Sequence, residues 1–385
     1  MTTANQFLSP HIALFGQNSR SLLVDLLKAK QYQKTLIVTD ANLVKLGIVE
    51  KVAAILDQTG LAYSVYSDVN PNPTTTNVLE AFDQYQKEGC DLVLTIGGGS
   101  PQDCGKAVAI LAKNGGNLWD YIKDKKPSKV AADIIAVTTT SGTGSECTYA
   151  YVISDPDAQM KYGTRDTNTQ PMIAVNDIDL MVNLPPHITA ATGMDALTHA
   201  VECLIGRRLY LMTRELALAA VKLIFEYLPT AVSDGYNLEA RDGMATAQYL
   251  AGLAFGNSGV GMVHSMSHQL SAIYNTAHGL ANAILLPFIL EFERPECTPQ
   301  LAMIARQTWA VEAADLSDDE AAKLTITRIA ELSKNVGTDK SLAEVGVKET
   351  DLDLLAEKTM PDGSLGNSAR IPTKEEVIQI YRDAI

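Results

Sequence analysis

The sequence has 385 residues, of which 46% are hydrophobic and 20% charged, so it can bury a large core and its length favours two domains over one. Its formal net charge of −14 argues against nucleic acid or an anionic membrane surface as a partner, because both bind to clustered Lys and Arg. We therefore expect the ligand to be a small neutral or cationic molecule.

The segment MTTANQFLSPHIALFG has no basic region followed by a long apolar run, and no later segment reaches the uninterrupted apolar length of a membrane span. The cysteines form no CxxC pair and mostly sit inside apolar runs, at Cys90, Cys104, Cys147, Cys203 and Cys297. This pattern predicts reduced, buried thiols. We expect a cytoplasmic protein with no membrane partner.

Short β-rich runs alternate with helical patterns through the first half of the chain. The runs are TLIVTD (35–40), AYSVYSD (62–68), DLVLTIGGGS (91–100), DIIAVTTT (133–140) and PMIAVND (171–177). Such alternation predicts βαβ units around a mostly parallel sheet. Several runs end in Gly, Ser, Thr or Asp, which predicts a ligand-binding edge at the carboxyl ends of the strands.

Two of these runs continue into loops that suit a phosphate. Gly97–Ser100 precede a helical pattern, and a glycine turn at a helix N-terminus lets backbone N–H groups approach an anion closely. The loop 137–147, VTTTSGTGSEC, adds hydroxyl groups after a second strand. Neither loop is a GxGxxG or Walker sequence, and a tight turn needing positive φ explains a glycine triplet equally well. Together they favour a bound pyrophosphate.

Asp40 ends the first of the five runs. At that position an acidic side chain could accept hydrogen bonds from a ribose diol and would repel a 2′-phosphate. The ordinary alternative is a helix N-cap for the residues that follow, and the sequence alone favours the N-cap.

The sequence of the second half of the chain predicts helices. From about Pro186 onward, stretches such as ELALAAVKLIFEYL (215–228) carry apolar residues at three- and four-residue spacing. LPPHIT (184–189) is the expected joint, with Thr189 or Thr192 as the cap of the next helix. The predicted domains are residues 1–185, an α/β dinucleotide-binding domain, and residues 186–385, an all-α metal-binding domain.

Histidines concentrate in this second half. Asp195 and His199 share one face of a predicted helix, as do His264 and His268, and His278 follows ten residues later. One buried histidine is more often a core residue than a ligand, but this grouping favours a metal site. Imidazole and carboxylate ligands without a thiolate suit Fe²⁺, Zn²⁺ or Ni²⁺ better than Mg²⁺ or Ca²⁺. Spacing alone does not decide which four residues are the ligands.

The segments GGGSPQDCGKA, TTTSGTGSE, AATGMDALTHAVE, VHSMSHQL and AHGLANAILLP occur in this order along the chain. In order and spacing they resemble the iron-activated (group III) alcohol dehydrogenases, the family that includes lactaldehyde reductase and 1,3-propanediol dehydrogenase. The similarity extends from about Thr35 to the C-terminal TKEEVIQIYRDAI. It implies an N-terminal Rossmann-like domain with a mostly parallel sheet, a helical C-terminal domain, and a metal in the cleft between them.

The resemblance also assigns residues. The implied metal ligands are Asp195, His199, His264 and His278, with Fe²⁺ as the expected ion and Zn²⁺ or Ni²⁺ as alternatives. His268 becomes a catalytic residue that relays a proton rather than a ligand. The implied cofactor is NAD rather than NADP, with Asp40 as the selector. The positions that match for cofactor binding are Asp40, Asn72, Gly98, Gly99, Ser100, Asp103, Thr139, Thr140, Thr148 and Lys161.

The implied activity is the interconversion of short primary alcohols or diols, such as 1,3-propanediol, 1,2-propanediol, ethanol and butanol, with their aldehydes. The alternatives are a glycerol dehydrogenase-like polyol enzyme and a non-redox relative similar to dehydroquinate synthase. The resemblance further implies a homodimer or larger homo-oligomer, with the segment from His11 to Phe15 pairing across the interface. Two segments depart from the family pattern: 206–216 lacks the usual Pro-containing turn, and 162–170 lacks the usual apolar strand.

Overall fold

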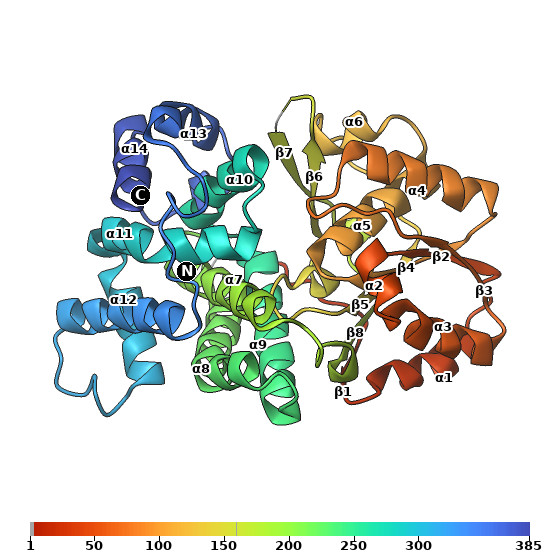
Figure 1. The fold of residues 1–385 in the computed structure, drawn as a ribbon, viewed down its shortest axis with the longest axis horizontal. Coiled ribbons are helices and arrows are strands. Elements are labelled where there is room, and N and C mark those ends of the chain that lie inside the picture. Colours follow the sequence, from red (N-terminus) through yellow and green to blue (C-terminus); the bar gives the residue numbers. More distant parts are fainter. Residues whose placement is uncertain (1–3, 159) are drawn as a thin grey trace. The chain divides into compact units, whose positions relative to one another are not determined.

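The computed structural model describes residues 4–158 and 160–385, and contacts along the chain divide them into two compact units. The α/β unit comprises residues 8–183. The helical unit comprises residues 184–385 together with residues 4–7. Figure 1 shows the strands confined to the α/β unit, drawn in red to yellow, while green to blue helices make up the helical unit.

A six-stranded parallel sheet forms the centre of the α/β unit, in the order β1-β8-β5-β4-β2-β3. The strands are β1 (Ile12–Gly16), β2 (Lys34–Val38), β3 (Ala62–Tyr66), β4 (Leu92–Gly97), β5 (Asp133–Thr138) and β8 (Ile173–Asp177). Five of these six were predicted from their β-rich runs. The sixth, β1, is an edge strand that pairs with β8 of its own chain.

Helices cover the sheet on both faces, which explains why the strands read as continuous apolar runs. Leu36 and Val38 belong to one apolar core, and Ile37 between them belongs to another. The first core includes residues of α4 (Thr75–Lys87) and α5 (Gly99–Asn114); the second includes residues of α1 (Leu23–Lys28) and α3 (Ile48–Thr59). The shorter helices are α2 (Ala41–Lys45) and α6 (Leu118–Ile122).

A two-stranded antiparallel hairpin, β6 (Ala150–Asp155) with β7 (Met160–Arg165), completes the α/β unit. The departure noted at 162–170 therefore does not remove the strand. Polar residues suffice because β7 forms a backbone ladder with β6, and most of its side chains are only partly buried. Lys161 lies on this strand, opposite Ser154.

The helical unit consists of α7 (Pro186–Ile205), α8 (Leu211–Ser233), α9 (Leu238–Ser258), α10 (Met262–Tyr274), α11 (His278–Thr308), α12 (Asp318–Asn335), α13 (Leu352–Thr359) and α14 (Lys374–Asp383). Helix α7 packs against α8, α9 and α11, so it is buried over nearly its whole length. A Cβ atom on Gly193 would lie only 2.2 Å from Leu228 Cδ1, so glycine lets α7 and α8 pack closely there.

The structure corrects one expectation. Neither Thr189 nor Thr192 caps α7: the helix begins at Pro186, whose fixed φ suits the first turn, and both threonines lie inside it.

Helix α8 is long and apolar enough to cross a membrane by length and composition alone, although charged residues at Arg214, Glu215, Lys222 and Glu226 interrupt its apolar sequence. Its buried face includes Ala217, Val221 and Ile224, which pack in the core of the helical unit.

Candidate active site

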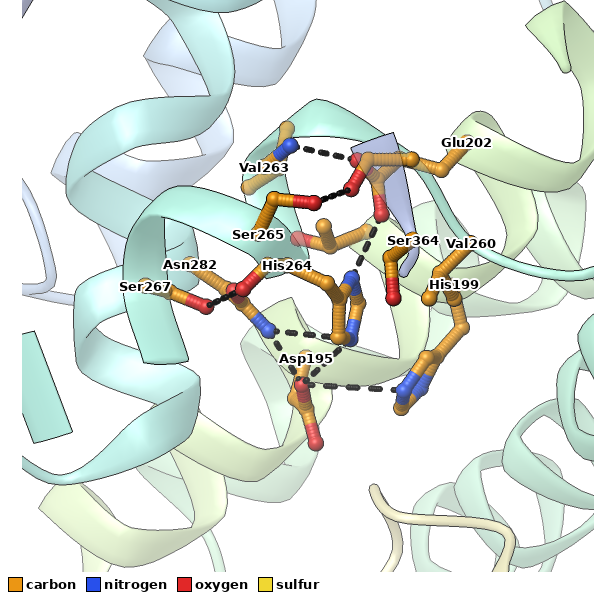
Figure 2. Close-up of polar contacts among 12 residues, drawn as sticks. Asp195, His199, Glu202, Val260, Val263, His264, Ser265, Ser267, Asn282 and Ser364 are labelled. Carbon is orange, nitrogen blue, oxygen red and sulfur yellow. Dashed lines mark hydrogen bonds and ion pairs between the residues drawn. The ribbon is translucent and has the colours of Figure 1, made fainter. Parts of the chain in front are cut away.

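Side chains from three helices of the helical unit converge around Asp195. Asp195 and His199 lie on α7, His264 lies on α10, and His278 is the first residue of α11. Asp195 Oδ1 lies 3.9 Å from Nε2 of both His199 and His264, and 3.7 Å from Nε2 of His278. Figure 2 shows Asp195, His199 and His264 facing one another. The predicted ligand set is thus assembled within one unit.

The chemistry of this set suits a cation. Asp195, His199 and His264 each offer one ligand atom, and these atoms lie within 4.8 Å of one another. Ligand atoms about 2.1 Å from a tetrahedral ion are separated by roughly 3.4 Å. A small inward movement of these three side chains would therefore bring their ligand atoms to coordination distance. Burial lowers the pKa of His264 well below its ordinary value, which favours the neutral imidazole that a metal ligand requires. The residues fit a divalent first-row metal.

Close helix packing brings His278 to the site. A Cβ atom on Gly279 would lie 2.2 Å from the Ala191 carbonyl oxygen on α7. Only glycine lets the first turn of α11 approach α7 so closely, and this approach places His278 beside Asp195. A sequence pattern of histidines does not reveal this requirement.

Ring stacking and two unpredicted polar residues orient the histidines. Phe255 of α9 stacks on His199, with ring centroids 4.0 Å apart and planes 13° apart. Asn282 Nδ2 donates to Asp195 Oδ1 at 2.7 Å and lies 3.3 Å from Nε2 of His264. Glu202 Oε2 lies 2.5 Å from His264 Nδ1. Glu202 and Asn282 each follow a predicted ligand by one helical turn, so spacing could have indicated them.

His268 makes different contacts. Its Nδ1 lies 2.9 Å from Asp362 Oδ2, and its ring stacks on His278 with centroids 5.5 Å apart. Burial alone would raise the pKa of Asp362, but His268, together with donors from Ser364 and Ser265, outweighs burial and lowers it to about 2. An ionised Asp362 holding the imidazole suits a proton relay better than metal ligation. The relay role of His268 stays a prediction.

In the α/β unit, the two predicted phosphate loops touch each other. Helix α5 begins at Gly99, with Gly98 as its N-cap. A Cβ atom on Gly98 would lie 3.2 Å from Thr140 Oγ1, and one on Gly99 would lie 3.2 Å from Thr143 Cγ2. The absence of side chains on both glycines keeps the start of α5 open beside the second loop, as a bound pyrophosphate would require.

Asn72, Ser100 and Lys161 also lie together. The Asn72 backbone N–H donates to Ser100 Oγ at 3.3 Å, and Lys161 Nζ donates to Asn72 Oδ1 at 2.8 Å. Asn72 has a φ of 77°, a left-handed conformation that asparagine tolerates better than most residues. Three positions separated in sequence thus form one polar group beside the N-terminus of α5.

Asp103 and Thr148 are linked through Ser145 and the buried Lys106, neither of which was among the predicted site residues. Lys106 Nζ donates to the Ser145 carbonyl oxygen at 2.7 Å and to Thr148 Oγ1 at 3.4 Å. Asp103 accepts from Ser145 Oγ at 2.8 Å and from the Val152 backbone N–H at 2.9 Å. Burial raises the pKa of Asp103, and nearby Lys106 opposes that shift. These contacts indicate that Asp103 shapes the loop.

Asp40 caps α2, as its ordinary interpretation predicted: Oδ1 accepts from the backbone N–H groups of Asn42 and Leu43. Both capping hydrogen bonds use the same carboxylate oxygen, so capping is compatible with a second role for Asp40 toward a ribose. Thr139 is buried, and its backbone N–H donates to the Gly97 carbonyl oxygen at 3.2 Å. Contact of either residue with NAD stays a prediction.

Comparison with known proteins identifies the family of the chain. The model of the iron-containing alcohol dehydrogenase family matches residues 10–178, and that of the C-terminal region of the Fe-containing alcohol dehydrogenase family matches residues 189–385. The chain is 38% identical to the NAD-dependent methanol dehydrogenase of Bacillus methanolicus, covering 98% of this chain and 99% of that one. It is 38% identical to 1,3-propanediol dehydrogenase of Citrobacter freundii, covering 98% of each.

A solved structure of a 1,3-propanediol oxidoreductase superposes with a TM-score of 0.96 at 37% identity, covering 100% of both chains. The resemblance recognised from the sequence segments is therefore confirmed, and so is the predicted fold class. The chain belongs to the iron-containing alcohol dehydrogenase family.

Proposed function

We propose that this protein is a metal-dependent, NAD-linked dehydrogenase that interconverts short primary alcohols or diols with their aldehydes. Candidate substrates are 1,3-propanediol, 1,2-propanediol, ethanol and butanol. The observation that carries the proposal is the approach of three histidine Nε2 atoms to within 3.7–3.9 Å of Asp195 Oδ1. Relatives named as an NAD-dependent methanol dehydrogenase and a 1,3-propanediol dehydrogenase support the substrate class.

Asp195, His199, His264 and His278 would hold the metal, with Fe²⁺ as the proposed ion and Zn²⁺ or Ni²⁺ as alternatives. Such an ion supplies Lewis acidity, which polarises a substrate oxygen and lowers the pKa of an alcohol. The chain itself supplies a neutral imidazole at His264, the Asp195 carboxylate and the ring of Phe255, which stacks on His199. His268, held by Asp362, would carry the proton released from the alcohol outward.

The α/β unit would bind NAD, which accepts the hydride. The contacting loops at Gly98–Ser100 and Thr139–Thr140 would hold the pyrophosphate. Asn72, Lys161 and Thr148 would contribute polar contacts, and Asp103 would fix the loop geometry. Asp40 would favour NAD over NADP, because its negative charge opposes a 2′-phosphate.

We further propose a cytoplasmic homodimer or larger homo-oligomer. Strand β1 is an edge of the sheet, so the segment from His11 to Phe15 can pair with a second copy along its open side. Sedimentation of monomer alone would contradict this assembly.

The test is NADH formation by metal-stripped protein reconstituted anaerobically with Fe²⁺, Zn²⁺ or Ni²⁺, assayed with ethanol, 1-butanol, both propanediols and glycerol. We expect activity only after metal addition, with short primary alcohols or diols preferred. Preference for glycerol would favour the polyol dehydrogenase alternative. Absence of activity in protein that binds both metal and NAD would favour a non-redox relative similar to dehydroquinate synthase.

A further inference from the structure

Glu202 is a buried carboxylate placed against the back of a predicted metal ligand. It lies on α7, one helical turn after His199, and is 1% exposed. Its Oε1 accepts from the Val263 backbone N–H at 2.6 Å, and its Oε2 lies 2.5 Å from His264 Nδ1. One side chain of α7 thus holds both the backbone and the imidazole at the start of α10.

The contact determines which nitrogen of His264 carries hydrogen. When the Glu202 carboxyl group is ionised it can only accept, so Nδ1 then donates to Glu202 and the lone pair of the neutral ring is on Nε2. Nε2 is the atom that lies 3.9 Å from Asp195 Oδ1. Figure 2 shows Glu202 on one side of the His264 ring and Asp195 on the other. The ring is therefore oriented for a ligand to bind at Nε2.

The surroundings of Glu202 also indicate a role other than stabilising the fold. A buried carboxylate is costly unless a positive charge compensates it. Among the described residues, no Lys or Arg forms an ion pair with Glu202; its Oε2 contacts the imidazole of His264, whose lowered pKa favours the neutral form. A cation held at Nε2 of the same ring would supply the compensating charge through the imidazole.

We propose that Glu202 is a positioning residue for the metal: it fixes the tautomer and orientation of His264 and so strengthens metal binding. The inference rests on the proposed function, because it presumes that His264 is a ligand. Carboxylate partners of metal-bound histidines typically change metal affinity by about 10- to 100-fold.

The chain provides a matched control in Glu293. It is equally buried, at 1% exposed, and lies in the same unit on α11. It accepts from the Arg370 backbone N–H at 3.3 Å rather than from a histidine. Burial and nearby Glu202 raise the pKa of Glu293 to about 8, so Glu293→Gln replaces an equally buried carboxyl group of the same unit without touching the ligand set.

The experiment measures the Zn²⁺ dissociation constant by competition with a chromophoric chelator, for the wild type, Glu202→Gln, Glu202→Ala and Glu293→Gln. We expect about 10- to 100-fold weaker binding for Glu202→Ala, a smaller loss for Glu202→Gln, and no change for Glu293→Gln. Glutamine can accept from only one of His264 and Val263, so its effect should be intermediate. Thermal melting of the metal-free proteins separates folding defects from binding defects.

Equal Zn²⁺ affinity in the wild type and Glu202→Gln would overturn the inference while leaving the proposed function intact. An equal loss in Glu202→Gln and Glu293→Gln would also overturn it, because it would show a general effect of replacing a buried carboxyl group. A wild-type protein that binds none of Zn²⁺, Fe²⁺ and Ni²⁺ would instead refute the proposed function. If Glu202→Ala does not fold, Glu202→Gln still decides the question.

Discussion

His268 and Asp362 are 94 positions apart in the chain, yet the histidine Nδ1 lies 2.9 Å from the aspartate Oδ2. Asp362 also accepts from the Ser364 backbone N–H at 2.9 Å and from Ser265 Oγ at 3.2 Å. The carboxylate is therefore fixed by its own loop and by α10. It holds the imidazole by one nitrogen and leaves Nε2 for proton exchange.

We expect Asp362→Asn to lower kcat by about tenfold, because the amide no longer provides an ionised partner for the imidazole. The metal content should not change, since Asp362 hydrogen-bonds to His268, Ser364 and Ser265 rather than to a predicted ligand. Steady-state kinetics together with metal analysis checks this. An unchanged kcat would show that the pair does not support turnover.

Replacing the imidazole itself should have a larger effect. His268→Ala should reduce kcat about 100-fold, the usual contribution of a general acid–base group, while the protein still binds one metal ion per chain. Metal analysis of the purified variant decides between relay and ligand. Loss of the metal would make His268 a ligand and would refute its assignment to proton transfer.

The two roles of Asp40 can be separated. Asp40→Asn keeps an oxygen that can cap α2 but removes the negative charge, so kcat/KM with NADP should rise while thermal stability changes little. Asp40→Ala removes both functions and should also cost about 1 kcal/mol of stability. Kinetics with both cofactors and thermal melting test this. If NADP use stays the same in both variants, Asp40 does not select the cofactor.

Lys106 should make the stability of the protein depend on pH. Burial, partly opposed by Asp103, Cys147 and Glu146, lowers the pKa of Lys106 from 10.5 to about 8. Between these values the unfolded chain holds a proton that the folded chain has released, so the free energy of unfolding rises with pH. The slope from this group approaches about 1.4 kcal/mol per pH unit.

Lys106→Met should lack this contribution. Urea unfolding of the wild type and the variant at about pH 7 and about pH 10 measures the difference. The wild type should gain stability relative to the variant at the higher pH. A constant difference between the two proteins would mean that Lys106 does not titrate in this range.

Gly279→Ala should disturb the predicted metal site by pushing α11 away from α7. The new Cβ would lie 2.2 Å from the Ala191 carbonyl oxygen, an overlap that typically costs about 1–3 kcal/mol. His278 should then bind the metal less well. Gly366→Ala is the control, because a Cβ there meets nothing within 4 Å. Equal metal affinity in the two variants would contradict the packing argument.

The elements of the fold that could be predicted are those with a characteristic local sequence pattern. Five strands of the sheet were visible because strands buried on both faces are continuous apolar runs. Strand β1 was expected only to pair across an interface, which stays a prediction, because IALFG does not reveal that it also pairs with β8, about 160 residues later in the same chain. The hairpin strand β7 was missed because backbone pairing, rather than apolar side chains, forms it.

The residues of the candidate site likewise fall into those that the sequence indicated and those that it did not. Helical spacing and family resemblance brought together the residues around Asp195, and the same spacing could have indicated Glu202 and Asn282. Asp362 had no such signal, because a turn far along the chain brings it to His268. Lys106 was overlooked since a lysine in a helical pattern is normally expected at the surface, whereas here it is fully buried.

Residues 4–7 belong to the helical unit although the α/β unit follows them in sequence, and Tyr210 donates from its hydroxyl to the Gln6 carbonyl oxygen at 3.3 Å. Ribosomes synthesise chains from the N-terminus, so the α/β unit emerges and can begin to fold before most of residues 184–385 have been made. The hydrogen bond between Gln6 and Tyr210 can form only after Tyr210 has left the exit tunnel. The two units are therefore not completed strictly one after the other in chain order, because the helical unit includes residues that are synthesised before the α/β unit.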